Sequence, residues 1–289
     1  MSTPPFLEVP PAVTAMAWRT RRGEHAVLHT PVPARAWAVL VPGFTGSKED
    51  FIALYQPLFD AGMGVIGFDQ RGQYQSPGSA EPDDYRLTSL AEDLRALIDE
   101  AHHRLGCTEP PHLLGHSLGG LVCQMAVAGG LAVSSLVLLC SGPGALPPAR
   151  RGRLADLQAA LPDTDLATLW ELKRAGERAP GAAEPPPAIA AFLARRWCAN
   201  DPIGMRAMAE ILCTCSDLTD DLAAVVSAAD LPVAVIWGAQ DDAWPVASQA
   251  QLARRLGASA TCLPTAGHSP NTEAPAALVT ALRETWPLR

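Results

Sequence analysis

The chain has 289 residues, of which 48% are hydrophobic and 18% charged, and its net charge is -8 at pH 7. This composition excludes a disordered protein, and the length suits one large α/β domain or a domain that carries an insertion. The acidic balance disfavours nucleic acid and anionic membranes as partners, since both select clustered Lys and Arg.

Apolar runs and helical patterns alternate along the first half of the chain. Residues 15–30 alternate about Arg22 and Gly23 and predict a two-stranded hairpin. Residues 36–43 form a short continuous apolar run, which is typical of a strand buried on both faces of a parallel sheet. The other elements expected in this half are helix 47–62, strand 63–69, helix 87–106, strand 111–117, helix 118–130 and strand 134–142.

The segment 145–228 interrupts this alternation. It has no convincing strand, is rich in Pro, Ala and Arg, and predicts three or four helices around Trp170, Phe192 and Trp197, with a loop at 178–190. We expect these helices to form a cap over one edge of the sheet, and a solvated helical appendage is the alternative. After the gap we expect strand 232–239, helix 248–258, strand 260–264 and helix 274–286.

Strands that alternate with helices predict an α/β fold with a mostly parallel sheet flanked by helices. We therefore divide the chain into a core, residues 1–144 and 229–289, and an inserted helical cap, residues 145–228. No run approaches the about 18 apolar residues of a membrane span. Residues 1–25 show no basic leader before an apolar core, so we expect a cytoplasmic protein.

The seven cysteines are an odd number without the spacing of a disulfide framework. Cys213 and Cys215 are the one close pair, and no second pair or Cys/His cluster completes a zinc site. We expect structural thiols, buried as small apolar side chains.

The stretch HLLGHSLGGLVCQMA, residues 112–126, places Ser117 between Gly115 and Gly119. Glycine in regular structure costs about 0.5–1 kcal/mol relative to alanine, so the arrangement needs a reason. A sharp strand-to-helix turn crowds the residues two before and two after it, and glycine relieves that crowding while the serine oxygen projects at the carboxyl edge of the sheet. The pattern predicts a nucleophile elbow, with a tight structural turn as the alternative.

A nucleophilic serine needs a base, and the base needs a partner that orients it. Asp241 and Asp242 follow the expected strand 232–239, and His268 lies in a loop after the next strand. The order Ser, Asp, His is the order found in the α/β-hydrolases.

The core resembles the α/β-hydrolase family over residues 15–144 and 229–289. The stretches GHSLGG, WGAQDDAWPV, AGHSP and FDQRGQYQSPG carry the resemblance. It implies the α/β-hydrolase fold, with Ser117 as nucleophile, His268 as general base and Asp241 as orienting acid. Asp241 is preferred to its neighbour because such loops place the acid three residues after the glycine, here Gly238. His116, beside the nucleophile, is expected to be a supporting polar residue.

The resemblance also implies an oxyanion hole built from the backbone N–H groups of Leu118 and Phe44. Pro42 stands where the family often has histidine, and proline has no N–H. Since the expected donor lies two positions later, catalysis should survive, but the hydrogen bonding that usually braces this loop is affected. Turn and helix-cap chemistry alone is the alternative for residues 44–51.

These features imply a serine hydrolase that cleaves a carboxylic ester, lactone or thioester of a small to medium apolar substrate through an acyl-enzyme. No metal or organic cofactor is implied, and the expected partner is a small-molecule substrate. The same triad serves amide, peptide and carbon–carbon bond hydrolases and perhydrolases, which stay open, as does the oligomeric state. A non-catalytic ligand-binding protein on this fold is the alternative from another class.

Overall fold

Eight strands form one sheet in the computed structural model, which describes residues 2–32, 36–177 and 184–288. The strands are β1 (Thr14–Thr20), β2 (Gly23–His29), β3 (Trp37–Val41), β4 (Gly64–Phe68), β5 (His112–His116), β6 (Ser135–Leu139), β7 (Val233–Gly238) and β8 (Ser259–Leu263). Their order in the sheet is β1-β2-β4-β3-β5-β6-β7-β8. The β1–β2 and β2–β4 pairs are antiparallel and the pairs from β4 to β8 are parallel, so the sheet is mostly parallel as predicted.

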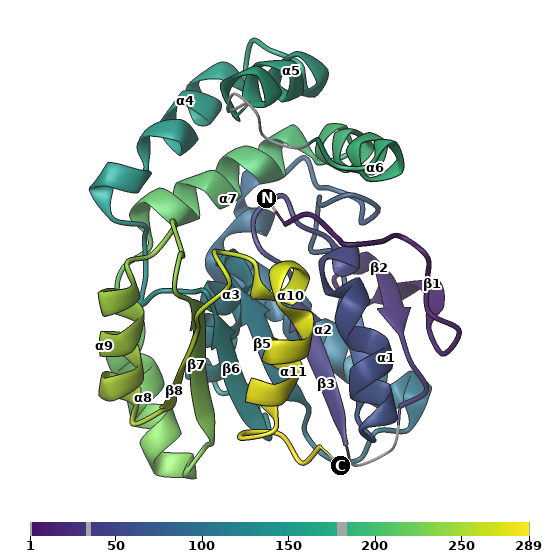
Figure 1. Cartoon of the computed structure of the whole chain (residues 1–289), viewed down its shortest axis with the longest axis vertical. Helices are drawn as coiled ribbons and strands as arrows, with labels where there is room; N and C mark the ends of the chain where they lie inside the picture. Colours follow the sequence, from purple (N-terminus) through teal and green to yellow (C-terminus); the bar gives the residue numbers. More distant parts are fainter. Residues whose placement is uncertain (1, 33–35, 178–183, 289) are drawn as a thin grey trace.

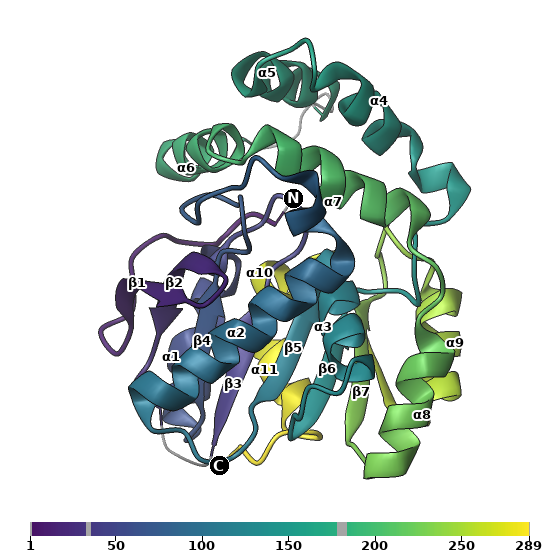
Figure 2. The ribbon, with the colours of Figure 1, turned by 180° about the vertical axis from the view of Figure 1, so that it is seen from behind.

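Helices cover both faces of this sheet. The α-helices of the described residues are α1 (Ile52–Asp60), α2 (Leu87–Leu105), α3 (Leu118–Ala128), α4 (Gly152–Ala160), α5 (Leu166–Glu177), α6 (Pro187–Cys198), α7 (Pro202–Thr214), α8 (Thr219–Ala229), α9 (Val246–Leu256), α10 (Pro270–Glu273) and α11 (Pro275–Leu282). Helices α1 and α11 lie over one face (Figure 1), and α2, α3 and α8 lie over the other (Figure 2). Helix α9 packs against α8 and β7. No helix of the described ranges is both long and apolar enough to cross a membrane.

The strands form where the sequence is continuously apolar. Every residue of β3, β4, β5, β6 and β7 is buried, because helices cover both faces of these central strands. The edge strands β1 and β8 are mostly exposed. Helix α2 ends at Gly106, whose φ of 67° is a left-handed conformation that glycine adopts without strain.

Four local features differ from the predictions. Helix 47–62 begins as a 3-10 turn, η1 (Lys48–Phe51), before α1 continues it, and α10 was not predicted. The segment 145–228 holds five described helices, α4 to α8, in place of three or four. Of the predicted loop 178–190, residues 178–183 lie outside the described part of the chain, and α6 already begins at Pro187. Proline is favourable in a first helical turn, where its missing N–H is not needed.

The cysteine prediction is wrong for four of the seven residues. Three are buried, but two are exposed and two partly exposed; the exposed or partly exposed ones are Cys198, Cys213, Cys215 and Cys262. They lie on or beside α6 and α7 and on edge strand β8, where solvent meets one side of the element. All seven are free thiols.

Helices α4 to α7 lie beyond one end of the sheet, at the top of Figures 1 and 2. They build a hydrophobic cluster of their own that includes Trp170, Phe192 and Trp197, the three aromatic residues expected at the centre of this segment. Helix α7 is packed closely on the core: Asp201 N donates to Gly72 O at 2.7 Å, and a Cβ on Gly204 would lie 2.5 Å from the ring of Tyr85.

Candidate active site

Ser117 forms the turn between β5 and α3. Its φ of 55° and ψ of -120° lie in a region that non-glycine residues rarely occupy. The surrounding backbone holds this conformation, because Ser117 N donates to Leu139 O and Ser141 Oγ donates to Ser117 O, each at 2.9 Å. Strain of this kind persists only where neighbouring structure fixes it, and it is concentrated at functional sites.

The glycines around Ser117 have the predicted cause. A Cβ on Gly115 would lie 2.5 Å from Gly119 O, and a Cβ on Gly119 would lie 2.3 Å from Val41 O. Both positions meet backbone atoms, which cannot move aside as a flexible side chain could. Glycine is therefore required on both sides of the turn, which also brings the start of α3 against the end of β3.

Three side chains from distant parts of the chain meet beside this turn. His268 Nδ1 lies 2.8 Å from Asp241 Oδ1, and His268 Nε2 lies 3.0 Å from Ser117 Oγ. A carboxylate only accepts hydrogen bonds, so Nδ1 carries the proton and Nε2 of the neutral ring accepts from the serine hydroxyl. The structure thus brings together the three residues that the sequence predicts, in the order hydroxyl, imidazole, carboxylate. Asp242 is exposed.

The Asp241 side chain is fully buried, and its hydrogen bonds keep it ionised. Burial by itself would raise its pKa. The hydrogen bond from His268, the charge of that ring when it is protonated, and the donors Ala243 N at 2.8 Å and Gln249 Nε2 at 2.7 Å lower the pKa below its usual value. Sequence reasoning missed Gln249. Its one signal was a polar residue on the inward face of α9, where it is fully buried.

His116 supports the loop that carries His268. Its Nε2 donates to His268 O at 2.7 Å, and burial, with the nearby His268, lowers its pKa to about 3. His116 is therefore neutral near pH 7, and it contacts the backbone of the neighbouring histidine, not Ser117 Oγ. This placement fits the supporting role predicted for it.

The two predicted backbone donors belong to the two segments that meet at Ser117. Leu118 is the first residue of α3, where a backbone N–H has no partner within the helix. Phe44 follows β3, and the preceding Gly43 is so near the turn that a Cβ on it would lie 3.0 Å from Ser117 Cβ. Phe44 is partly buried and packs against both the core and the hydrophobic cluster of helices α4 to α7, called the inserted helices below.

One group near the turn could offer metal ligands. Cys140 Sγ, an Asp241 oxygen and a His268 nitrogen lie within 4.8 Å of one another. A cysteine ligand must be a thiolate, and burial raises the pKa of the Cys140 thiol well above its usual value, so this set is poorly suited to a cation. The thiol instead donates to Gly267 O at 3.6 Å.

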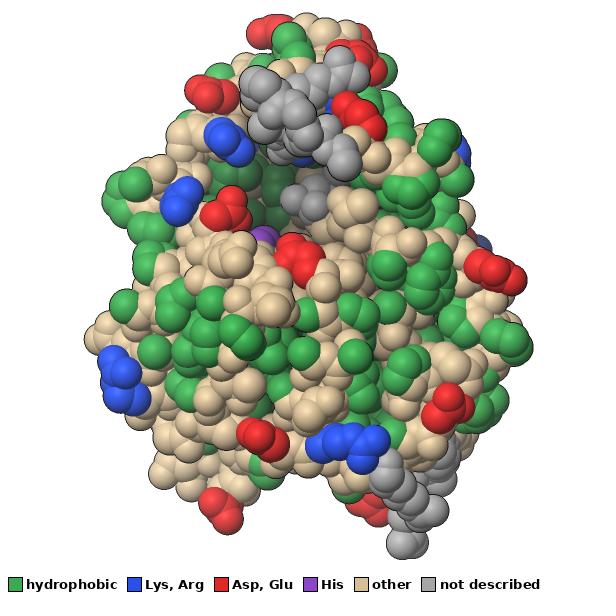
Figure 3. Space-filling view, viewed as in Figure 1, with side chains coloured by type: hydrophobic (Ala, Val, Ile, Leu, Met, Phe, Trp, Pro, Cys, Tyr) green, Lys and Arg blue, Asp and Glu red, His purple; other side chains and the backbone are tan. Residues whose placement is uncertain are grey.

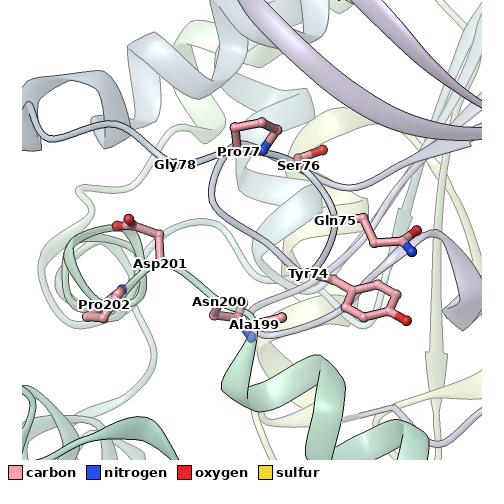
Figure 4. Close-up of a pocket in the computed structure, with 9 residues that line it drawn as sticks. All are labelled: Tyr74, Gln75, Ser76, Pro77, Gly78, Ala199, Asn200, Asp201 and Pro202. Atoms are coloured by element: carbon pink, nitrogen blue, oxygen red, sulfur yellow. The ribbon is translucent and has the colours of Figure 1, made fainter.

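The surface is hollowed between the inserted helices and the sheet. Figure 3 shows hydrophobic side chains inside this hollow and a histidine at its lower edge. A second pocket, of about 330 Å³, lies between the loop that follows β4 and the turn between α6 and α7 (Figure 4). Its lining residues are Tyr74 to Gly78 and Ala199 to Pro202, so it is separate from Ser117 and His268.

This fold and site define an α/β protein with a serine–histidine–aspartate arrangement at the carboxyl edge of its sheet. Residues 38–281 match the alpha/beta hydrolase family, and the chain belongs to that family. Its fold is the α/β-hydrolase fold.

Three individual proteins to which this chain is similar are named as hydrolases or esterases. Over 144 residues the chain is 35% identical to a Variovorax paradoxus protein named carbamate hydrolase RutD, a match that covers 48% of this chain and 49% of that protein. The chain thus aligns with about half the length of this curated relative. A hydrolase of Pseudomonas aeruginosa is similar in structure, with a TM-score of 0.76, 24% identity, and coverage of 94% of this chain and 98% of that one. The esterase EaEST of Exiguobacterium antarcticum gives a TM-score of 0.75 at 18% identity, covering 94% and 98%.

Proposed function

We propose that this protein is a serine hydrolase that cleaves a carboxylic ester, lactone or thioester. Ser117 is the nucleophile, His268 the general base and Asp241 the acid that orients the imidazole. The observation that carries the proposal is the continuous hydrogen-bonded path from Ser117 Oγ through the His268 ring to Asp241, with contacts of 3.0 Å and 2.8 Å.

The reaction follows from these contacts. His268 Nε2 removes the proton as Ser117 Oγ attacks the carbonyl carbon, and the imidazolium that forms is stabilised by the ionised Asp241. The N–H groups of Leu118 and Phe44 stabilise the oxyanion of the tetrahedral intermediate. His268 then protonates the leaving group, and the same histidine activates the water that releases the acid from the acyl-enzyme.

Of the cap predicted over residues 145–228, we assign this role to helices α4 to α7, which bind the apolar part of the substrate; α8 instead packs against α3 and α9. Support comes from the cluster of Trp, Phe, Leu, Ile and Met side chains that α4 to α7 form, against which Phe44 and Tyr74 pack. The hollow in Figure 3 also has hydrophobic side chains inside it. A substrate of small to medium size with an apolar acyl or alcohol group fits such a lining.

Labelling by a fluorophosphonate tests the nucleophile. The wild type should be labelled at Ser117, which peptide mass spectrometry locates, and Ser117→Ala should not be labelled. Ser89→Ala is the matched control, because Ser89 is a partly exposed serine that donates to Asp83 O, and it should label like the wild type. A folded wild type that does not react favours the non-catalytic binding protein.

The substrate class is decided by a panel of p-nitrophenyl esters graded by acyl length, with lactones, thioesters and carbamates beside them. Carbamates belong in the panel because the Variovorax relative is named a carbamate hydrolase, over a match that covers about half of each chain. If kcat/KM for a carbamate exceeds that for every ester, carbamate hydrolysis becomes the preferred reaction in place of ester hydrolysis.

A further inference from the structure

The loop after β3 lies directly against the turn at Ser117. A Cβ on Gly43 would lie 3.0 Å from Ser117 Cβ, and a Cβ on Gly119 would lie 2.7 Å from Pro42 O. The peptide that joins Gly43 to Phe44 is therefore held beside the reacting hydroxyl. Its orientation decides where the Phe44 N–H points.

Two buried glutamines bind the carbonyl groups of this loop. Gln70 Nε2 donates to Pro42 O at 2.8 Å, and Gln73 Nε2 donates to Gly43 O at 2.9 Å. Gln70 is 2% exposed and Gln73 is 1% exposed. Both come from the loop after β4, in which Gln73 N donates to Gln70 O at 2.9 Å, so one turn presents the two amides together. The loop that lacks the usual histidine is thus braced from another segment of the chain.

The Gln73 contact acts on the same peptide as the Phe44 N–H. In a planar trans peptide the C=O and N–H groups point in opposite directions, so fixing the Gly43 carbonyl fixes the Phe44 N–H. Gly46 N also donates to Gly43 O, at 3.0 Å. Hydrogen bonds in a chain polarise one another, so a donor on the carbonyl also strengthens the N–H as a donor.

The amide orientation of Gln73 follows from its surroundings. Nε2 faces two acceptors, Gly43 O and, at 3.8 Å, Met208 Sδ of α7. The flipped amide would place its oxygen against the Gly43 carbonyl, which is repulsive. The contact with Met208 also joins the brace to the inserted helices.

We propose that Gln73 is a positioning residue for the reaction: its amide holds the Gly43–Phe44 peptide so that the Phe44 N–H points at the developing oxyanion. The inference rests on the proposed function, since an oxyanion forms only if Ser117 attacks a carbonyl. Gln70 holds the preceding peptide, between Pro42 and Gly43, so its effect on the Phe44 N–H is indirect.

The test replaces the amide by a side chain of similar length without a donor, in Gln73→Met. We expect kcat for a p-nitrophenyl ester to fall about tenfold, less than for loss of an oxyanion donor itself, while KM changes less than about twofold. Affinity for a trifluoromethyl ketone, whose adduct with Ser117 carries an oxyanion, should fall by the same factor as kcat. Gln70→Met is the matched comparison, with an expected loss in kcat below about threefold.

Gln73→Glu is the second variant, because it keeps the shape of the side chain and turns an oxygen toward the Gly43 carbonyl. It should lose at least as much kcat as Gln73→Met, and it decides the question if Gln73→Met does not fold. Thermal unfolding checks each variant. A folded variant with wild-type kcat overturns the inference. So does a folded variant whose KM rises by as much as its kcat and its ketone affinity fall. A wild type that is neither labelled by fluorophosphonate nor active on any ester overturns the proposed function itself.

Discussion

Asp241→Asn, paired with Asp242→Asn, tests which of two adjacent carboxylates orients His268. The Asp241 side chain is fully buried and accepts from His268, Ala243 and Gln249, whereas Asp242 is exposed. We expect Asp241→Asn to remove most of the activity and Asp242→Asn to remove almost none. Each changes a carboxylate to an amide of the same shape.

The size of the loss follows from the contacts of Asp241. An asparagine oxygen in place of Oδ1 can still accept from His268, and its NH2 group then faces Gln249 Nε2. Gln249 Oε1 is buried and has no partner among the described residues, so a flip of this amide relieves the clash with the asparagine NH2 group, although it removes the hydrogen bond from Gln249 Nε2 to Trp244 O. The His268 tautomer then survives and the carboxylate charge is lost. Two charges about 4 Å apart at an effective dielectric of about 20 interact by about 4 kcal/mol, which is about 10³-fold in kcat.

The assay is kcat/KM for a p-nitrophenyl ester at neutral pH, with thermal unfolding as the check that both variants fold. Without the Gln249 flip the imidazole adopts the wrong tautomer, and the loss approaches about 10⁴-fold. The exposed substitution should stay within about threefold of the wild type. Equal losses in the two variants, or a loss below tenfold for Asp241→Asn, would refute the assignment of the orienting acid.

The remaining predictions concern stability. Gly119→Ala should lower the free energy of unfolding in urea by about 1–3 kcal/mol and abolish fluorophosphonate labelling, because the new Cβ meets backbone atoms. In the control Gly152→Ala the Cβ meets nothing within 4 Å, so this variant should not lose stability. Asp50→Asn should cost about 3–5 kcal/mol, since it leaves the charge of the fully buried Arg196 without a carboxylate partner. The double variant Asp50→Leu/Arg196→Met should recover most of that loss, and no recovery would contradict the pairing. The pKa of His116 is lowered by burial to about 3, so between pH 6 and 4 the unfolded chain binds its proton and the folded chain does not, and stability rises with pH. His116→Gln should reduce that slope by about 1.4 kcal/mol per pH unit, and an unchanged slope would contradict it.

Local patterns in the sequence were sufficient for the core elements. Continuous apolar runs identified the buried strands, and the glycines around Ser117 indicated the turn because their spacing reflects contacts within one strand–turn–helix unit. The choice of Asp241 came from its offset from Gly238, again a local feature. Cysteine burial was predicted wrongly where it depended on which side of α6, α7 or β8 faces solvent, which composition does not encode.

Contacts between segments far apart in the chain were decided only by the tertiary structure. Gln73 binds Gly43 O across 30 residues, and Arg196 pairs with Asp50 across 146. Neither pair leaves a periodic signal, because a hydrogen bond depends on where two loops lie in space and not on the spacing along either one. The sequence alone therefore determined the strand–helix order and the three residues proposed for the chemistry. The hydrogen bonds to the loop after β3 and the position of the inserted helices depended on how the sheet and its loops pack.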